Sequence, residues 1–368
     1  MRIPFVDLSE SVRQIKTEYL AAVEKLLIKG RFILTEEVEE FEKNWARAVG
    51  TKYAVGVSNG ADAIYLALAA LGLKAGDEVI TQGTAYNASV TPILRLGAIP
   101  RFADIRPDTL TIDPERIEPL INAKTKVILP VHLYGQAADM EAIMAIAQKH
   151  DLAVVEDCAQ AHLAKFKDKY GGSWGDAGAF SFYPTKNLGA FGDAGAVVTS
   201  RDDIRDKIRA MRNLGEIVKN DHQYLGFNMR LDPIQAICLN LKLPHLTQVS
   251  RERQAAGEYY DKLIRDLDIP IRPVSRLPGA THVYHLYVVQ TLKHDRDMIC
   301  RELASRGVET AVHYPLPVYR QPFYRGPADP CPLTDEALAR IFSLPMFSGI
   351  TKEMQEYAAQ SLKEIVLR

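Results

Sequence analysis

The sequence has few of the features that mark secreted, redox or membrane proteins. It holds only four cysteines, Cys158, Cys238, Cys300 and Cys331, with no Cys-x-x-Cys pair. Such scattered thiols indicate a reducing compartment rather than a disulfide framework. The N-terminal residues lack a signal-peptide core, and no apolar run reaches the roughly 18 residues of a transmembrane helix. These absences predict a cytoplasmic protein without membrane contact.

An excess of charge of one sign is also missing. The chain carries 45 Lys and Arg against 46 Asp and Glu, which gives a net charge of -1. No strong field therefore favours nucleic acid or an anionic membrane, and an anionic substrate must be held by local groups. The sequence contains neither a Gly-x-x-x-x-Gly-Lys-Ser/Thr loop nor a Gly-x-Gly-x-x-Gly after a strand. A nicotinamide-dependent oxidoreductase is therefore a weak alternative.

Strands and helices are predicted to alternate along the first half of the chain. Alternation of this kind favours an α/β fold with a mostly parallel sheet that is covered by helices on both faces. In such sheets, ligands bind beyond the carboxyl ends of the strands. The predicted strands are 53–57, 78–81, 99–103, 126–131 and 153–156, and the helices are 10–28, 35–48, 61–71, 88–96, 113–121 and 140–150.

The pattern changes after Thr199, and the length of 368 residues exceeds one typical core of about 150 residues. We predict a large domain over 1–244 and a smaller C-terminal α+β domain over 245–368. Pro244 is expected to bend or interrupt the helical path. The predicted elements here are helices 201–214, 231–243, 254–267, 295–306 and 352–366 and a strand at 285–290.

A lysine and an acid suggest the chemistry. Lys186 lies in a turn-rich loop between the apolar runs 178–183 and 194–199, and Asp157 follows the strand 153–156. The lysine amine is suited to forming a Schiff base with a carbonyl group, provided that the pKa of the amine is lowered. The acid is suited to pairing with a protonated pyridine nitrogen. A surface lysine and a helix N-cap are the structural alternatives, but together the two residues favour a pyridoxal phosphate enzyme.

Other residues fit the same cofactor. Gly60 and Ala61 open a helix whose N-terminus favours a phosphate, and Ser181 offers a hydroxyl group. Tyr86 follows the strand 78–81, where an aromatic ring is able to stack on the cofactor or simply to pack in the core. No metal site is predicted, because the histidines show no ligand spacing.

Several motifs are spaced along essentially the whole chain. They are Ile3-Pro-Phe-Val-Asp7, Ser58-Asn-Gly60, His132-Leu-Tyr-Gly135, Val155-Glu-Asp157-Cys-Ala-Gln160-Ala-His162, Ser181-Phe-Tyr-Pro-Thr-Lys186-Asn-Leu-Gly189, Gly226-Phe-Asn228-Met-Arg230-Leu-Asp232 and Ser343-Leu-Pro345-Met. These motifs are specific in combination, and with them the chain resembles the DegT/DnrJ/EryC1/StrS family of sugar aminotransferases, which have the fold type I aminotransferase fold.

The resemblance implies roles for several of these residues. Lys186 would form the Schiff base with pyridoxal 5'-phosphate and move protons, and the second half-reaction would use pyridoxamine 5'-phosphate. Gln160 would lie near the ring hydroxyl of the cofactor. Asn228 would reach the phosphate from the partner subunit, because this family builds its site at the interface of a homodimer. The remaining implied cofactor contacts are Gly60, Ala61, Tyr86, Asp157 and Ser181.

The resemblance also implies a substrate. The forms Lys186-Asn-Leu-Gly-Ala and Lys242-Leu-Pro-His-Leu are most similar to enzymes of nucleotide-linked 3-keto-6-deoxyhexoses. L-glutamate would donate the amine to a keto-sugar of a nucleoside diphosphate, with dTDP and C3 as the expected nucleotide and carbon. The sequence departs from the family pattern at Ala61, Leu163 and Tyr319. The expected substrate contacts are Tyr183, Lys219, His313 and Tyr314.

Four alternatives remain at the level of sequence. Amination at C4, or of another keto-sugar or cyclitol, would use the same cofactor site. The dehydratase branch of the family carries a histidine in place of the lysine, so Lys186 argues against it. A regulatory, non-catalytic member would keep the fold without turnover, and an oxidoreductase is disfavoured by the missing glycine fingerprint.

Overall fold

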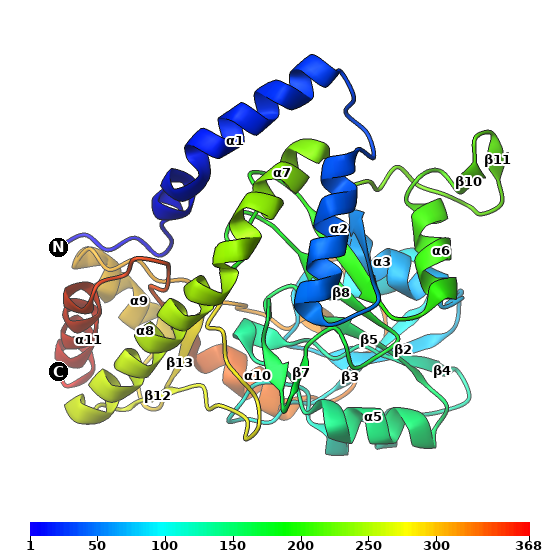
Figure 1. The fold of residues 1–368 in the computed structure, drawn as a ribbon. Helices are drawn as coiled ribbons and strands as arrows, with labels where there is room; N and C mark the ends of the chain where they lie inside the picture. Colours follow the sequence, from blue (N-terminus) through cyan, green and yellow to red (C-terminus); the bar gives the residue numbers. More distant parts are fainter.

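A computed structural model describes residues 1–368, and its centre is a seven-stranded sheet (Figure 1). All neighbouring strands are parallel except at β9, which runs antiparallel to both β1 and β8. The predicted, mostly parallel sheet is therefore confirmed. Its order is β1 (Tyr53–Val57), β9 (Gly195–Thr199), β8 (Ala177–Ser181), β5 (Ala153–Asp157), β4 (Thr125–Ile128), β2 (Glu78–Gln82) and β3 (Ile99–Ala103).

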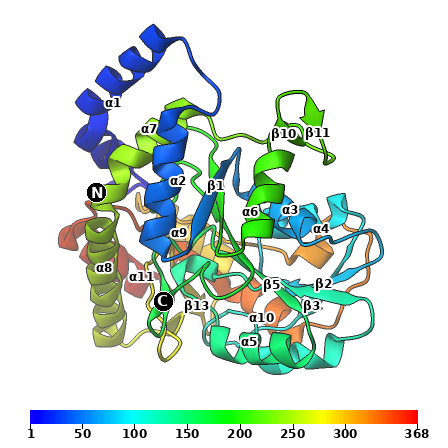
Figure 2. The same cartoon turned by 45° about the vertical axis from the view of Figure 1, so that its right-hand side comes forward.

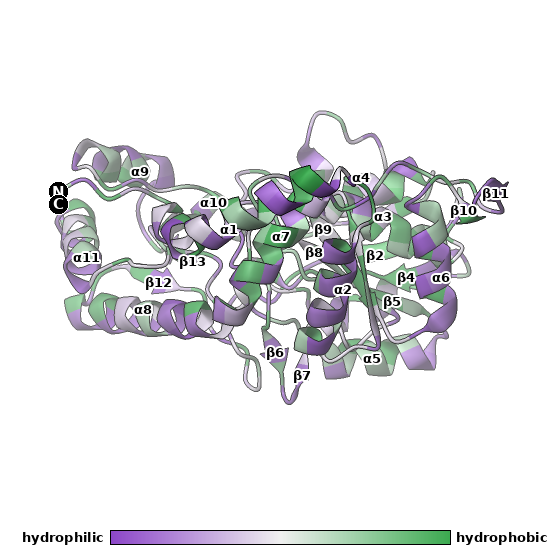
Figure 3. Cartoon of the chain, turned by 45° about the horizontal axis from the view of Figure 1, so that its top comes forward, coloured by the Kyte–Doolittle hydropathy of each residue, from purple (hydrophilic) through white to green (hydrophobic).

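Helices cover both faces of this sheet. Alternate residues of one strand enter different cores: Val55 packs in the core with α3, whereas Ala54 packs in the core with α2. In Figure 3 the central strands are mostly green, while the outer helices alternate between purple and green, as expected for amphipathic helices. The helices of this part are α2 (Glu36–Val49), α3 (Gly60–Ala70), α4 (Asn87–Arg95), α5 (Met140–Lys149), α6 (Asp202–Met211) and α7 (Pro233–Lys242).

A second core lies toward the C-terminus, beside the large sheet (Figures 1 and 2). Three antiparallel strands pack there with three helices, which agrees with the predicted α+β character. The boundary at residue 244 stays a prediction. The elements are α8 (Leu246–Leu267), β12 (Ile271–Pro273), β13 (Tyr287–Thr291), α9 (Arg296–Ser305), β14 (Ile341–Leu344) and α11 (Lys352–Val366).

Several predicted elements differ in the structure. The helix expected over 113–121 is wrong: two 3-10 turns, Pro114–Arg116 and Glu118–Leu120, replace it. Pro119 explains this, because a proline inside a helix lacks the N–H donor and clashes with the preceding turn. β4 ends at Ile128 rather than at residue 131. The elements not predicted are the hairpin strands β6 (Lys165–Phe166), β7 (Lys169–Tyr170), β10 (Glu216–Val218) and β11 (Asp221–His222), the strands β12 and β14, and α10 (Pro332–Arg340). For β8 and β9 the sequence indicates only apolar runs, not strands.

The helix expected over 254–267 begins earlier. α8 starts at Leu246, directly after a 3-10 turn, Leu243–His245, that joins it to α7. Pro244 occupies this turn, where its missing N–H costs nothing, so the predicted interruption is confirmed but is only three residues long. No helix in the structure has the length and hydropathy to cross a membrane.

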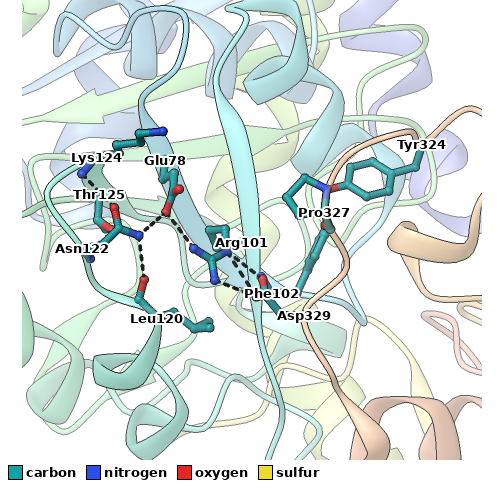
Figure 4. A network of polar contacts seen from close by, with 10 residues as sticks. All are labelled: Glu78, Arg101, Phe102, Leu120, Asn122, Lys124, Thr125, Tyr324, Pro327 and Asp329. Atoms are coloured by element: carbon teal, nitrogen blue, oxygen red, sulfur yellow. Dashed lines mark hydrogen bonds and ion pairs between the residues drawn. The ribbon is translucent and has the colours of Figure 1, made fainter.

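A polar network fastens the C-terminal part of the chain to β3 (Figure 4). The guanidinium of Arg101 donates to both Asp329 oxygens, at 2.8 to 3.2 Å, and to Glu78 at 3.0 Å. Asp329 also accepts the backbone N–H of Phe102 at 2.8 Å, and Asn122 donates to Glu78 at 2.7 Å. The segment before α10 is thereby held against the side of the large sheet.

Candidate functional site

The site lies where several strands of the large sheet end. β1, β5 and β8 end close to one cavity of about 520 Å³. This is the position at which open α/β sheets bind ligands. The lining side chains come from loops and helix starts that are up to some 250 residues apart in the sequence. Among the predicted residues, the lining includes Gly60, Ala61, Tyr86, Asp157, Gln160, Ser181, Tyr183, Lys186, His313 and Tyr314.

One end of the cavity suits a phosphate. Gly60 is the first residue of α3, where the first N–H groups of the helix have no intrahelical acceptor. A Cβ atom at position 60 would lie 2.6 Å from the Cβ atom of Ser181, so only glycine allows this close approach. Ala61 and the Ser181 hydroxyl border the same space. Backbone donors, a helix N-terminus and a hydroxyl are the groups that hold a phosphate.

The charge of an acid in the same helical turn is partly compensated by its neighbours. Asp62 accepts hydrogen bonds from the Ser58 hydroxyl at 2.6 Å and from the Asn59 amide at 2.8 Å. Arg95 forms an ion pair with it at 3.1 Å. The carboxylate is thus directed toward these donors, and its negative charge is partly compensated beside the anion-binding end.

Asp157 ends β5 and is 3 % exposed. One carboxylate oxygen accepts the backbone N–H of Ala159 at 3.0 Å, and the other accepts the hydroxyl of Ser89 at 2.6 Å. Each oxygen still has a free lone pair, and the carboxylate borders the cavity. The side chain is therefore able to accept a further N–H from a ligand there.

Lys186 lies in the loop between β8 and β9, and its side chain borders the same cavity. The backbone N–H of Lys186 donates to the carbonyl of Tyr183 at 2.8 Å, which fixes the loop as a turn. Burial lowers the pKa of the Lys186 amine to about 8, although the negative charge of Asp157 acts in the opposite direction. A neutral, nucleophilic amine is therefore accessible near neutral pH.

The reactivity of Lys186 is expected to follow this pKa. Only the neutral amine attacks an acylating reagent, so the labelling rate of Lys186 in the cofactor-free protein should rise through pH 8 and level off above about pH 9. Mass spectrometry of the labelled peptide measures this rate. In Asp157→Asn the midpoint should fall, because the charge that favours the ammonium form is gone.

Lys52 is the control for this measurement. Its hydrogen bond with Tyr53 and its pairing with Asp202 raise its pKa above 10.5, so its labelling should still increase beyond pH 10. A Lys186 profile that coincides with the Lys52 profile would contradict the electrostatics described above.

Three histidines surround the lysine. Burial lowers the pKa of His162 to about 3 and that of His313 to about 4, and it lowers the pKa of His285 well below its ordinary value. All three rings are therefore neutral and add no positive charge beside the amine. His162 contacts the carbonyl of Ser181 at 2.9 Å, and His313 contacts the hydroxyl of Ser343 at 3.1 Å.

Gln160 and Tyr86, which are predicted to contact the cofactor ring, both contact Tyr314. The Gln160 side chain accepts the backbone N–H of Tyr134 at 2.7 Å and donates to the hydroxyl of Tyr314 at 3.1 Å. The rings of Tyr86 and Tyr314 stack with their centroids 4.9 Å apart. Tyr86 and Tyr183 are each 52 % exposed and stand at the open side of the cavity. These side chains form a wall of amide and aromatic groups.

Two predicted site residues lie elsewhere. Lys219 is exposed between the hairpin strands β10 and β11, and Asn228 is exposed after this hairpin. Figure 1 shows the hairpin projecting from the body of the subunit, and neither residue lines the cavity of its own chain. Tyr319, where the sequence departs from the family pattern, is also outside the cavity, and its hydroxyl donates to Asp335 at 2.9 Å.

Sequence reasoning missed some residues of the site. Ser89 and His285 border the cavity, but no motif singled them out. The signal for Ser89 was its place in the first turn of a predicted helix that follows a strand end. Thr185 and Asp193 also line the cavity, on either side of Lys186 in the sequence.

Comparison with known proteins places the chain in a family. The family model described as the DegT/DnrJ/EryC1/StrS aminotransferase family matches residues 13–363. The chain belongs to this family. The resemblance seen in the motifs is thereby confirmed, and so is the aminotransferase fold. The family depends on pyridoxal phosphate, and the cavity contains a lysine, a carboxylate and a phosphate-binding helix start that fit this cofactor. The protein is a pyridoxal phosphate-dependent aminotransferase.

Several relatives are similar over nearly their whole length. A "pleiotropic regulatory protein" of Geobacillus stearothermophilus is 40 % identical over 99 % of this chain and 98 % of the relative. The dTDP-3-amino-3,4,6-trideoxy-alpha-D-glucose transaminase of Streptomyces venezuelae is 40 % identical over 94 % of this chain and 91 % of the relative. The crystal structure of S. venezuelae DesV in complex with a ketimine intermediate superposes with a TM-score of 0.96 at 38 % identity, covering 100 % of this aminotransferase and 99 % of DesV.

Proposed function

We propose that this aminotransferase moves an amino group from L-glutamate to the C3 keto group of a deoxyhexose carried by dTDP. Relatives support this proposal. The transaminase of S. venezuelae is named for a 3-amino dTDP-sugar, and so is an Aneurinibacillus thermoaerophilus relative that is 38 % identical over 98 % of this chain. Two further relatives are named as aminotransferases of a 3-dehydro and a 3-oxo UDP-sugar. A nucleotide-linked sugar is therefore common to the names of these four relatives.

The observation that carries the proposal is that one cavity contains Lys186, an acid and a set of groups suited to a phosphate. Gly60, Ala61 and Ser181 would bind the phosphate of the cofactor, and Asp157 would accept the N–H of its pyridine ring. When bound, the cofactor supplies a carbonyl that takes up the amine and a cationic ring that withdraws electrons from the substrate carbon.

The remaining proposed contacts hold the ring in place. Tyr86 would cover one face of it, and Gln160 would lie near its hydroxyl group, once the contacts of both side chains with Tyr314 adjust. Tyr314 and His313 border the same cavity and would contact the sugar.

Lys186 is the proton carrier of this site. Its Nζ atom would take a proton from the carbon of the amino donor and return one to the sugar carbon. An amine with a pKa of about 8 changes its protonation state easily at neutral pH. The neutral histidines around Lys186 add no positive charge that would disfavour its ammonium form, so burial is the cause of its lowered pKa.

We also propose a homodimer in which the partner completes the site. Lys219 and Asn228 do not line the cavity of their own chain, and they lie beside apolar side chains that are exposed in the single subunit. α1 (Ser9–Lys29) contacts α7 at the edge of the subunit in Figures 1 and 2 and carries more such side chains. These exposed residues are Leu20, Leu27, Ile28, Phe32, Ile33, Leu214, Ile217, Val218, Tyr224 and Leu225.

In this dimer, Asn228 would reach the cofactor phosphate of the partner. Lys219 would contact the sugar nucleotide, together with Tyr183, His313 and Tyr314 of the subunit that holds the cofactor. The positive charge of Lys219 is suited to the diphosphate of the substrate.

A regulatory protein is the second candidate, because the relative of G. stearothermophilus is named for regulation. The two candidates differ in turnover. A regulatory member would bind the cofactor without moving the amine of glutamate.

The experiment follows each half-reaction. Cofactor-loaded enzyme mixed with L-glutamate should release 2-oxoglutarate in an amount equal to the enzyme. The aminated enzyme should then convert a dTDP-3-keto-6-deoxyhexose to its 3-amino sugar, as judged by mass spectrometry and NMR. Faster conversion of a 4-keto sugar or of a UDP-sugar would overturn the carbon or the nucleotide, and absence of 2-oxoglutarate would favour the regulatory candidate.

A further inference from the structure

Ser89 is a buried hydroxyl with one partner. It lies in the first turn of α4 and is 2 % exposed, and its hydroxyl donates to Asp157 at 2.6 Å. The backbone N–H of Ser89 donates to the carbonyl of Tyr86 at 2.9 Å. A single turn at the start of α4 therefore presents Tyr86 to the cavity and the Ser89 hydroxyl to the acid.

The carboxylate of Asp157 is held by two donors that contact different oxygens. The backbone N–H of Ala159 binds one oxygen at 3.0 Å, and Ser89 binds the other. A carboxylate that is bound at both oxygens cannot rotate freely, and its remaining lone pairs point in fixed directions. The positive end of the α4 dipole lies on the Ser89 side and favours the same placement.

Another group competes for the same carboxylate. The amine of Lys186 borders the same cavity as Asp157, and its ammonium form attracts the negative charge of the Asp157 carboxylate. If the bond from Ser89 were absent, only the Ala159 N–H would oppose rotation of the carboxylate toward this amine. The acid would then face the lysine rather than a ring nitrogen.

We infer that Ser89 is a positioning residue that directs the Asp157 carboxylate at the ring nitrogen of the bound cofactor. This inference rests on the proposed pairing of Asp157 with that nitrogen. It assigns to α4 a part in cofactor recognition that goes beyond the stacking of Tyr86.

The test compares two cofactors in the full-length enzyme. Pyridoxal 5'-phosphate has the ring nitrogen, whereas 1-deazapyridoxal 5'-phosphate has a carbon in its place and makes no bond to Asp157. Apoenzyme is titrated with each compound. In Ser89→Ala the affinity for pyridoxal phosphate should fall about tenfold, the usual effect of one hydrogen bond to a charged group, while the affinity for the deaza compound changes less than about twofold.

Two variants make the result specific. Ser89→Thr keeps the hydroxyl and should restore the preference for pyridoxal phosphate. Ser361→Ala makes the same substitution at another buried helical serine, in α11 far from the cavity, and should leave both affinities unchanged. Equal losses of affinity for the two compounds in Ser89→Ala would show a merely structural role and overturn the inference, and so would unchanged binding of both.

The titration also separates this inference from the pairing on which it rests. Wild-type enzyme that binds both compounds equally would remove the pairing of Asp157 with the ring nitrogen. A wild-type preference that survives unchanged in Ser89→Ala would remove only the role of Ser89. Neither outcome depends on turnover, so the proposed sugar substrate is tested separately.

Discussion

Replacing Lys186 with alanine is expected to lower the rate of transamination by about 10⁴-fold. The variant would lose both the amine proposed to bond to the cofactor and the base proposed to move the proton at the substrate carbon. The cofactor should still bind, because the groups at the start of α3 would hold its phosphate, but it should be removable by gel filtration. Stopped-flow absorbance with L-glutamate measures the rate, and mass spectrometry of the borohydride-treated protein measures the covalent attachment.

Lys242 provides the matched control. It is also a partly buried lysine with a lowered pKa, and its amine donates to the carbonyl of Gly189 in the loop that carries Lys186. Lys242→Met therefore disturbs the same loop without removing the amine of Lys186. A rate loss in Lys242→Met as large as that in Lys186→Ala would mean that loop structure, not the catalytic amine, is responsible.

Replacing Glu42 with glutamine is expected to lower the free energy of unfolding by about 3 kcal/mol. Glu42 and Arg212 form a buried ion pair in which the residues are 7 % and 4 % exposed. Glu42 also accepts the N–H of Gly56 at 2.8 Å, and Arg212 donates to the carbonyl of Gly56 at 2.6 Å. The variant leaves the buried guanidinium of Arg212 without its counter-charge, beside Gly56 in β1, the strand that precedes Gly60.

Equilibrium denaturation by urea measures this loss. The control is Glu141→Gln, which removes an ion pair with Lys167 in which both side chains are more than half exposed. Exposed pairs contribute at most about 1 kcal/mol, so this variant should unfold almost as the wild type does. Equal effects of the two substitutions would contradict a special contribution of the buried pair.

Much of the site could be predicted because it depends on local sequence. Gly60 and Asp157 lie near the ends of predicted strands, Ser181 lies in a predicted apolar run, and parallel strands bring their carboxyl ends to one edge of the sheet. The loop of Lys186 is defined by its own glycines and proline. Such features are set within a few residues, so the pattern of strands was sufficient to group them.

The remaining features depend on contacts between distant segments. The bond from Ser89 to Asp157 joins residues 68 positions apart, and no periodicity encodes it. Lys219 and Asn228 do not line the cavity of their own chain, and in the proposed dimer their contacts would depend on the placement of a second subunit. The helix predicted over 113–121 shows that local patterns also mislead. The pattern of polar and apolar residues indicates a helix, but the proline at position 119 prevents it.

The network around Arg101 has a consequence for solubility. β3 is the last strand of the large sheet, and an unprotected edge strand offers unpaired backbone groups to other chains. Asp329 occupies the N–H of Phe102, and Asp104 accepts the N–H groups of Leu333 and Thr334 at the start of α10. The C-terminal segment thus covers part of this edge, and we expect it to protect the large sheet from pairing with the strands of other chains.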